Sequence, residues 1–310
     1  MKTTLSARLI AVPRVLVGAL LVAINTLVHA TPLLALALLK LVMPLEAFRR
    51  WISRVLIGIA ESWIAINSWL MTALAGVVIT VEGMEPLRRR GWYLVICNHQ
   101  SWVDIPVLQQ VFNRRIPFLK FFLKRQLIWV PVLGLAWWAL DFPFMRRTSK
   151  EQLKRHPQLR GKDTEATRRA CEKFRHLPVS VMNFVEGTRF SQFKHRRRQS
   201  PYAQLLQPRA GGIALVLGAM GEMIDAIVDV TIHYPGGRPG VIDLLAGRVR
   251  EVTVKVDAIP IPADLLGGDY ENDRLFRTRF QNWLNERWAM KDALLDQASK
   301  STPPDRSGPS

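Results

Sequence analysis

The stretch that decides the fold runs from Trp92 to Asp104 and reads WYLVICNHQSWVD. Its first half, up to Cys97, is aromatic, aliphatic and β-branched, which is the composition of a buried strand. The next four residues are polar, and an apolar pattern resumes after Asp104. In α/β folds, reactive groups lie where a strand ends and a helix begins. The run therefore predicts an α/β fold with a polar site at the carboxyl end of this strand.

His99 and Asp104 are the chemically informative pair in this run. Residues five apart do not share a face of one helix, because helix neighbours are three or four apart. We therefore expect His99 just before the helix and Asp104 in its first turns, where the carboxylate can accept a hydrogen bond from the imidazole. Such a pair is a general base, with the second ring nitrogen free to take a proton. The spacing alone also allows a buried pair that only satisfies polar groups at a strand end.

The composition indicates an anionic partner and excludes one kind of metal site. The 310 residues include 43 Lys and Arg against 25 Asp and Glu, a formal charge of +18. This balance favours nucleic acid, an acidic membrane surface or a phosphorylated substrate as the partner. The two cysteines, Cys97 and Cys171, are too few for a cysteine-based zinc site and indicate no disulfide framework. The histidines do not cluster as ligands, and we expect no metal.

The N-terminal segment predicts attachment to a membrane. Between Leu9 and Leu45 the only charged residues are Arg14 and Lys40, and the apolar stretch between them exceeds the roughly 20 residues needed to span a bilayer. A polar cluster ending at Pro32 interrupts it, so the segment is either one tilted span or a helical hairpin in one leaflet. The arginines and tryptophans that follow are typical of an interfacial helix, or of one that packs against the next domain.

A second informative run is Val179–Arg198, VSVMNFVEGTRFSQFKHRRR. Its start alternates like a buried strand, and a tight polar turn of Glu186, Gly187, Thr188 and Arg189 follows. Glycine lets a backbone approach a ligand closely, and arginine offers a fork that matches phosphate oxygens. We interpret Arg189 as a phosphate ligand. For the arginines that end the run we favour a solvated surface with some attraction to a membrane.

The whole pattern predicts an α/β fold: a mixed central sheet flanked by helices, with an N-terminal hydrophobic, membrane-anchoring helical region. We divide the chain into a membrane-associated helical region (1–75), an α/β catalytic domain (76–297) and a disordered tail (298–310). The predicted strands are 77–81, 92–97, 116–119, 179–185, 227–234 and 249–256, joined near the end by a Pro/Gly-rich loop at 235–240.

Four blocks of the chain match motifs of a known family. Residues 98–104 are similar to N-H-x-x-x-x-D, and 184–189, FVEGTR, to F-P-E-G-T-R at a comparable distance downstream. Residues 124–134 resemble K-x-E-L-x-x-x-P-x-x-G, and 140–147 lie where F-I-x-R is expected. These are motifs of the glycerolipid acyltransferases, the lysophosphatidic acid acyltransferase family, and the resemblance covers roughly 75 to 260.

The chain departs from that family at two blocks. In the FVEGTR block, Val185 replaces the usual proline. A further family block, normally V-P-[IV]-x-P-V, reads IDAIVDVT at 224–231 without its prolines. This form, with Lys194 and His195 after the E-G-T-R-F run, is similar to the lysocardiolipin acyltransferase-like branch. The acceptor head group and the acyl-chain length therefore stay open.

The resemblance implies a membrane-bound acyltransferase of phospholipid synthesis. His99, oriented by Asp104, would deprotonate the free glycerol hydroxyl of a lysophospholipid acceptor, which attacks an acyl thioester donor, acyl-CoA or acyl-ACP. No other cofactor and no metal is implied. The partners are then the acceptor, the donor and an anionic membrane surface, at the cytoplasmic side of the inner membrane. The implied substrate-binding residues are Glu186, Gly187, Thr188, Arg189, Lys124 and Arg146.

Two other classes of function compete with this one. A non-catalytic, basic membrane-surface protein would use the charge alone and keep the His–Asp pair for structure. A lipid or thioester hydrolase would need a nucleophile elbow, and G-x-S-x-G is absent from the sequence. We expect no nucleic acid partner, because the sequence contains no recognisable nucleic-acid module.

Overall fold

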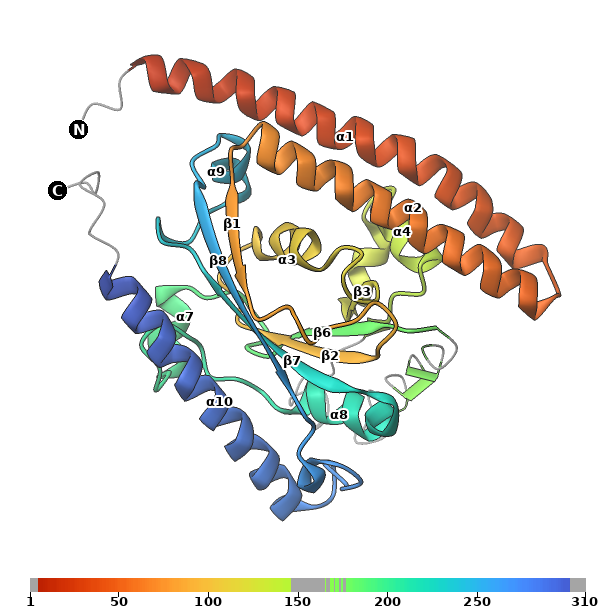
Figure 1. The fold of residues 1–310 in the computed structure, drawn as a ribbon, viewed down its shortest axis with the longest axis vertical. Helices are drawn as coiled ribbons and strands as arrows, with labels where there is room; N and C mark the ends of the chain where they lie inside the picture. Colours follow the sequence, from red (N-terminus) through yellow and green to blue (C-terminus); the bar gives the residue numbers. More distant parts are fainter. Residues whose placement is uncertain are drawn as a thin grey trace.

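The computed structural model describes residues 5–145, 165, 168–169, 171–172, 174 and 177–301. In this part of the chain six strands form one sheet in the order β1-β8-β7-β2-β6-β3 (Figure 1). β7 and β8 are antiparallel and the other neighbours are parallel, so the sheet is mixed. The predicted α/β fold, a mixed central sheet flanked by helices, is confirmed. The strands are β1 (Val78–Glu82), β2 (Tyr93–Cys97), β3 (Leu119–Phe121), β6 (Ser180–Phe184), β7 (Ala226–His233) and β8 (Glu251–Ile259).

Strand β2 lies at the centre of this sheet and positions the site. It pairs in parallel with both β6 and β7, and Cys97 at its end is level with Phe184 and Val230. Because parallel strands end at the same edge, the residues after β2 and after β6 meet there, beside the end of β7.

The side chains of β2 point alternately into two cores. Val95 and Cys97 belong to the core that contains α3 (Asp104–Phe112). Leu94 and Ile96 belong to the core on the other face, which α8 (Gly211–Met220) and α10 (Arg274–Ser301) cover. A strand that is buried on both faces reads as a continuous apolar run, which is why the sequence identified it.

Helix α10 covers the sheet with one apolar stripe. Phe276, Phe280, Leu284 and Trp288 recur at every fourth position, and all four are buried. This spacing keeps them on one helix face. The helix continues to Ser301, so residues 298–301 of the predicted disordered tail are helical, and residues 302–310 lie outside the described residues.

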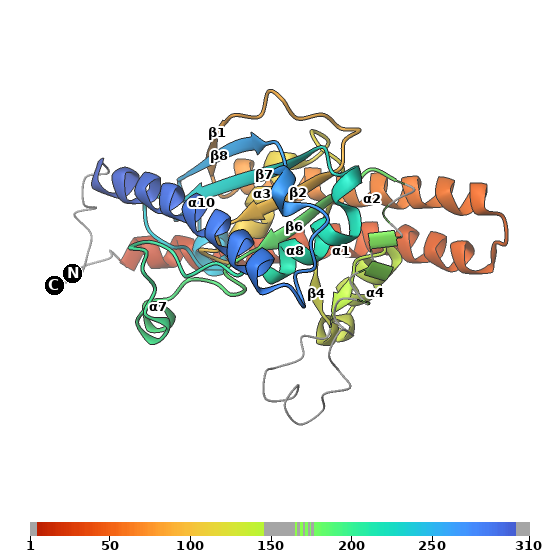
Figure 2. The same cartoon turned by 90° about the horizontal axis from the view of Figure 1, so that it is seen from below.

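Two long helices, α1 (Leu5–Val42) and α2 (Glu46–Ala73), form a hairpin along one side of the domain (Figures 1 and 2). Polar side chains join them: Asn25 Nδ2 donates to Asn67 Oδ1 at 2.9 Å, and Trp63 Nε1 donates to Thr26 Oγ1 at 3.1 Å. Both helices are long and apolar enough to cross a membrane. Such interhelical hydrogen bonds stabilise helix pairs in lipid as well as in water.

Helix α1 runs without interruption through Pro32, so of the two forms that the sequence allowed for the first apolar segment, one continuous helix is present and the internal hairpin is not. Proline removes one backbone N–H donor, and this loss is tolerated where neighbouring groups hold the helix. Here His29, one turn before Pro32, contacts the carbonyl of Asn25 at 2.9 Å and the hydroxyl of Ser62 in α2 at 3.2 Å. The hairpin is formed by α1 with α2 instead.

The hairpin is fixed to the α/β domain by ion pairs. Glu61 of α2 is buried and accepts a hydrogen bond at 2.7 Å from Arg89, in the segment between β1 and β2. At the other end, Lys40 of α1 pairs with Asp141 at 2.8 Å. The packing of the second helix against the α/β domain, one of the two possibilities that the sequence allowed, is therefore present.

Candidate active site

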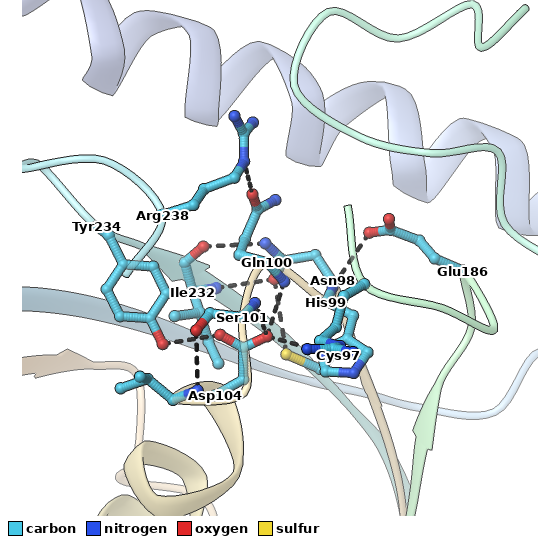
Figure 3. Close-up of polar contacts among 12 residues, drawn as sticks. Cys97, Asn98, His99, Gln100, Ser101, Asp104, Glu186, Ile232, Tyr234 and Arg238 are labelled. Atoms are coloured by element: carbon cyan, nitrogen blue, oxygen red, sulfur yellow. Dashed lines mark hydrogen bonds and ion pairs between the residues drawn. The ribbon is translucent and has the colours of Figure 1, made fainter. Parts of the chain in front are cut away.

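The expected hydrogen bond between His99 and Asp104 is present. Nδ1 of His99 lies 2.8 Å from Oδ2 of Asp104 (Figure 3). His99 follows β2 directly, and Asp104 is the first residue of α3, so a short loop joins the two side chains. The carboxylate holds the imidazole in the tautomer whose proton is on Nδ1 and leaves Nε2 as the acceptor.

Asp104 is held rigidly although it is fully buried. Its Oδ2 also accepts from the backbone N–H groups of Gln100 and Ser101, at 2.7 and 2.9 Å. Its Oδ1 accepts from the hydroxyl of Tyr234 at 2.7 Å. A buried carboxylate is stable when several donors replace its lost water. The same donors fix the direction from which Asp104 meets His99.

Asn98 joins the site to the neighbouring strand. Its buried amide donates to the carbonyl of Ile232 and accepts from the N–H of Ile232, both at 2.9 Å. Asn98 is the first residue after β2 and Ile232 lies in β7, so a side chain continues the pairing of these two strands one residue beyond the end of β2. The backbone of His99 therefore leaves the sheet at a fixed point (Figure 3).

The ring of His99 is held between its carboxylate and an aromatic ring. It stacks on Phe184 with a centroid distance of 3.9 Å, and its side chain is 12% exposed. Within the described part of the chain, Nε2 has no hydrogen-bond partner. Nε2 is therefore the atom of the ring that can accept a proton from a bound molecule.

Glu186 is buried beside His99 at the end of β6. Its carboxyl oxygens accept from the backbone N–H groups of His99 and Leu206, each at 3.2 Å. Burial raises the pKa of Glu186 to about 8, against the two backbone hydrogen bonds, which lower it. The Glu186 side chain therefore holds the backbone of His99 against the E-G-T-R turn.

The raised pKa of Glu186 predicts a pH dependence of stability. Between the ordinary value of 4.5 and about 8 the folded protein keeps a proton that the unfolded chain loses. The unfolding free energy therefore falls as pH rises through this window, by up to about 1.4 kcal/mol per pH unit, and levels off above it.

Comparing the wild type with Glu186→Gln isolates this effect. At pH 5 the variant is expected to be less stable than the wild type, because its amide N–H must face one of the two backbone donors. The Tm difference between wild type and variant is expected to shrink as the pH rises from 5 to 8. Parallel Tm curves over this range would show that Glu186 does not titrate as described.

The E-G-T-R turn carries Arg189 and is bonded to the backbone of His99. Gly187 has a φ of 70°, which favours glycine and lets the chain turn tightly. The guanidinium carbon of Arg189 lies over the ring of Trp102, 3.9 Å from its centroid. The next residue, Phe190, donates its N–H to the carbonyl of His99 at 2.7 Å. Among the described residues Arg189 has no carboxylate partner, so its charge is open to an anionic ligand.

Thr188, one of the implied substrate-binding residues, contacts Lys194 of the segment after the turn. Its hydroxyl accepts a hydrogen bond from Lys194 Nζ at 2.9 Å, and the same ammonium donates to the carbonyl of Arg189 at 2.9 Å. Burial and the neighbouring arginines lower the pKa of Lys194.

The structure does not bring together all the residues that the motifs implied. Lys124 ends the short strand β4 (Leu123–Lys124), which pairs with β5 (Phe144–Met145), and its side chain is exposed. No contact in the described part of the chain joins Lys124 to the His99 network. Arg146 lies outside the described residues.

Sequence reasoning missed two contributors from the loop region after β7. Tyr234 bonds Asp104, and Arg238 donates to the side-chain oxygen of Gln100 (Figure 3). Arg238 also lies on the ring of Phe190, 3.8 Å from its centroid. The Pro/Gly-rich loop was predicted to be only a connection. Their position could have identified them, because Tyr234 ends the predicted strand 227–234 and Arg238 follows it, and β7 pairs with β2.

These features define a class of site: a histidine–carboxylate pair near an arginine without a carboxylate partner among the described residues, at the carboxyl edge of an α/β sheet. Residues 78–234, about half of the chain, match the family model Acyltransferase. The chain belongs to this acyltransferase family.

The chain is similar to several curated proteins. It is 27% identical over 218 residues to 1-acyl-sn-glycerol-3-phosphate acyltransferase gamma of Mus musculus, covering 66% of this chain and 52% of that protein. With the epsilon form of Mus musculus it shares 23% identity over 256 residues, covering 74% and 64%. The chain thus spans about half the length of the first of these relatives.

A solved structure also resembles the chain. It is the crystal structure of the 1-acyl-sn-glycerophosphate (LPA) acyltransferase PlsC from Thermotoga maritima. Its TM-score is 0.49 at 16% sequence identity, and the match covers 89% of this chain and 98% of that one.

Proposed function

We propose that the protein is a membrane-bound enzyme that moves a fatty acyl group from an acyl thioester to the free glycerol hydroxyl of a lysophospholipid of the 1-acyl-glycerol-3-phosphate type. The observation that carries this proposal is the 2.8 Å contact of His99 Nδ1 with buried Asp104, which leaves Nε2 open beside the turn of Arg189. Membership of the acyltransferase family and the printed names of the relatives support it.

The proposed reaction is a direct transfer with His99 as the base. Nε2 takes the proton of the acceptor hydroxyl while the oxygen attacks the thioester carbonyl. The new C–O ester bond forms, the C–S bond breaks, and the thiol leaves with the proton from Nε2. Asp104 stabilises the imidazolium that exists between these proton transfers. No protein nucleophile and no cofactor other than the donor is needed.

Arg189 would hold the acceptor phosphate. In a 1-acyl-glycerol-3-phosphate the reacting hydroxyl and the phosphate are on adjacent carbons, so the base and the phosphate ligand must be neighbours. The 2.7 Å bond from Phe190 N–H to the His99 carbonyl makes the Arg189 turn a direct neighbour of the base. The guanidinium lies over the ring of Trp102, a contact with a π-face that uses none of the carboxylate- or phosphate-binding capacity of its N–H groups.

Replacing Arg189 with alanine is expected to raise the KM for the acceptor by about 10- to 100-fold, because a hydrogen bond to a charged group is worth about 1.5–3 kcal/mol. Steady-state kinetics with the acceptor varied and the donor saturating measures this. Arg90→Ala, which removes an exposed arginine between β1 and β2, is the matched control. An unchanged KM for Arg189→Ala would show that another group holds the phosphate.

The proposed site of action is the cytoplasmic face of the inner membrane. Leu16, Leu20 and Leu27 on α1 are each more than half exposed, and such a stripe is stable in lipid rather than in water. The +18 charge favours the anionic cytoplasmic leaflet, where thioester donors are available.

Product analysis tests the proposal. Purified protein is incubated with acyl-CoA or acyl-ACP and each of lysophosphatidic acid, lysophosphatidylglycerol and lysocardiolipin, and the products are identified by mass spectrometry. The proposal predicts, for at least one of these acceptors, a product that carries one more acyl chain than the acceptor. Free fatty acid as the sole product would identify a hydrolase instead.

A further inference from the structure

Helix α7 (Gln192–Arg198) is fixed by one face to the turn that carries Arg189. Lys194 on this face donates to Thr188 and to the carbonyl of Arg189, both at 2.9 Å. Arg198 donates to the backbone carbonyl of Glu186 at 3.3 Å. Both ends of the E-G-T-R turn are therefore attached to this helix, and the two must move together.

The other face of α7 has no partner in the described part of the chain. Phe193 is 70% exposed, and the arginines at the third and fourth positions after it, Arg196 and Arg197, are exposed as well. This spacing places the three side chains on one side of the helix. Among the described residues the two arginines form no ion pair or hydrogen bond through their side chains.

Helix α7 projects from the domain beyond the sheet. In Figure 2 it lies on the same side as the lobe formed by η1 (Arg125–Trp129) and α4 (Leu133–Ala139). Trp129 in this lobe is 84% exposed. The segment that joins β1 to β2 lies at the opposite side in the same view.

We propose that the outer face of α7 binds the headgroup layer of an anionic bilayer, with Phe193 in the interface and Arg196 and Arg197 on lipid phosphates. An aromatic ring flanked by two unpaired guanidinium groups complements a surface that is apolar beneath an anionic layer. This rests on the proposed function, in which the acceptor is a membrane lipid. Because α7 is attached to the E-G-T-R turn, its docking would hold Arg189 at the depth of the acceptor phosphate.

The first test compares two forms of acceptor. The variant Phe193→Ser/Arg196→Gln/Arg197→Gln is assayed with lysophospholipid embedded in phosphatidylglycerol-containing vesicles, and with a short-chain acceptor that is monomeric in water. We expect at least a tenfold loss of rate on vesicles and no change on the monomeric acceptor. Arg88→Gln/Arg90→Gln, two exposed arginines between β1 and β2, is the control and should behave as the wild type in both assays.

A loss of equal size in both assays would overturn the proposal, since α7 would then only support the turn. Full activity of the triple variant in both would overturn it as well. If the wild type transfers to neither form of acceptor, the proposed function fails, while the docking of α7 is still decided by the second test.

The second test measures the environment of α7 without using activity. Cys97 and Cys171 are buried, so a cysteine introduced by Phe193→Cys can be labelled selectively with an environment-sensitive fluorophore. In proteoliposomes we expect a blue shift that grows with the phosphatidylglycerol fraction and quenching by a shallow nitroxide lipid. The label at Arg90→Cys should stay in water. A fully aqueous label on α7 would contradict bilayer docking and would direct the search to a protein partner.

Discussion

Replacing His99 with alanine is expected to lower kcat for acyl transfer by roughly 10²- to 10⁴-fold, the range that a positioned general base contributes. Nε2 of His99 has no hydrogen-bond partner among the described residues, and Nδ1 is held at 2.8 Å by Asp104. The alanine variant keeps the Arg189 turn, so the KM for the acceptor should change little.

The fold of this variant has to be checked, because the His99 ring also packs on Phe184. His99→Gln, which keeps most of the side-chain volume, is expected to fold and to be as inactive as the alanine variant. Circular dichroism and the thermal transition of both variants provide the control. Activity of His99→Gln within a factor of ten of the wild type would show that His99 is not the base.

Asp104→Asn is expected to lower kcat by up to about 10⁴-fold, the size of the effect that the corresponding substitution has in serine proteases. The substitution can keep the local geometry. The amide oxygen can still accept from His99, Gln100 and Ser101, while the hydroxyl of Tyr234, now 2.7 Å from Oδ1, can rotate to accept from the new N–H. What is lost is the negative charge that stabilises the imidazolium.

Tyr234→Phe provides the matched comparison for Asp104→Asn. It removes one hydrogen bond to Oδ1 and leaves the contact of Asp104 with His99 intact. Its kcat should therefore fall much less than that of Asp104→Asn, because the carboxylate keeps its charge and its other three donors. If the rate of Asp104→Asn stayed within tenfold of the wild type, the carboxylate would have a structural role only.

Much of the sheet could be predicted because its signals are local. The run from Trp92 to Cys97 is apolar throughout, as a strand buried on both faces must be, and the structure places β2 between two parallel neighbours. Pro32 shows the limit of local reasoning. The proline leaves both an interrupted and a continuous helix open, and α1 is continuous in a hairpin whose contacts, such as that of His29 with Ser62, pair residues far apart in the chain.

The part of the candidate site that depends on residues close together in the sequence was predictable, and the part that depends on long-range contacts was not. His99 and Asp104 are five residues apart, so their contact follows from the strand–loop–helix pattern alone. Tyr234 reaches Asp104 only because β7 pairs with β2. Arg238 reaches Gln100 from the loop beyond, and no sequence pattern specifies that pairing.

The measurement that tests the central claim most directly is the release of thiol from acyl-CoA and acyl-ACP, recorded with and without each lysophospholipid acceptor, for the wild type and His99→Gln. The account predicts release that requires both an acceptor and His99 and that equals the diacyl product formed. Thiol release of the same rate without any acceptor would contradict it, because water would then be the acyl acceptor.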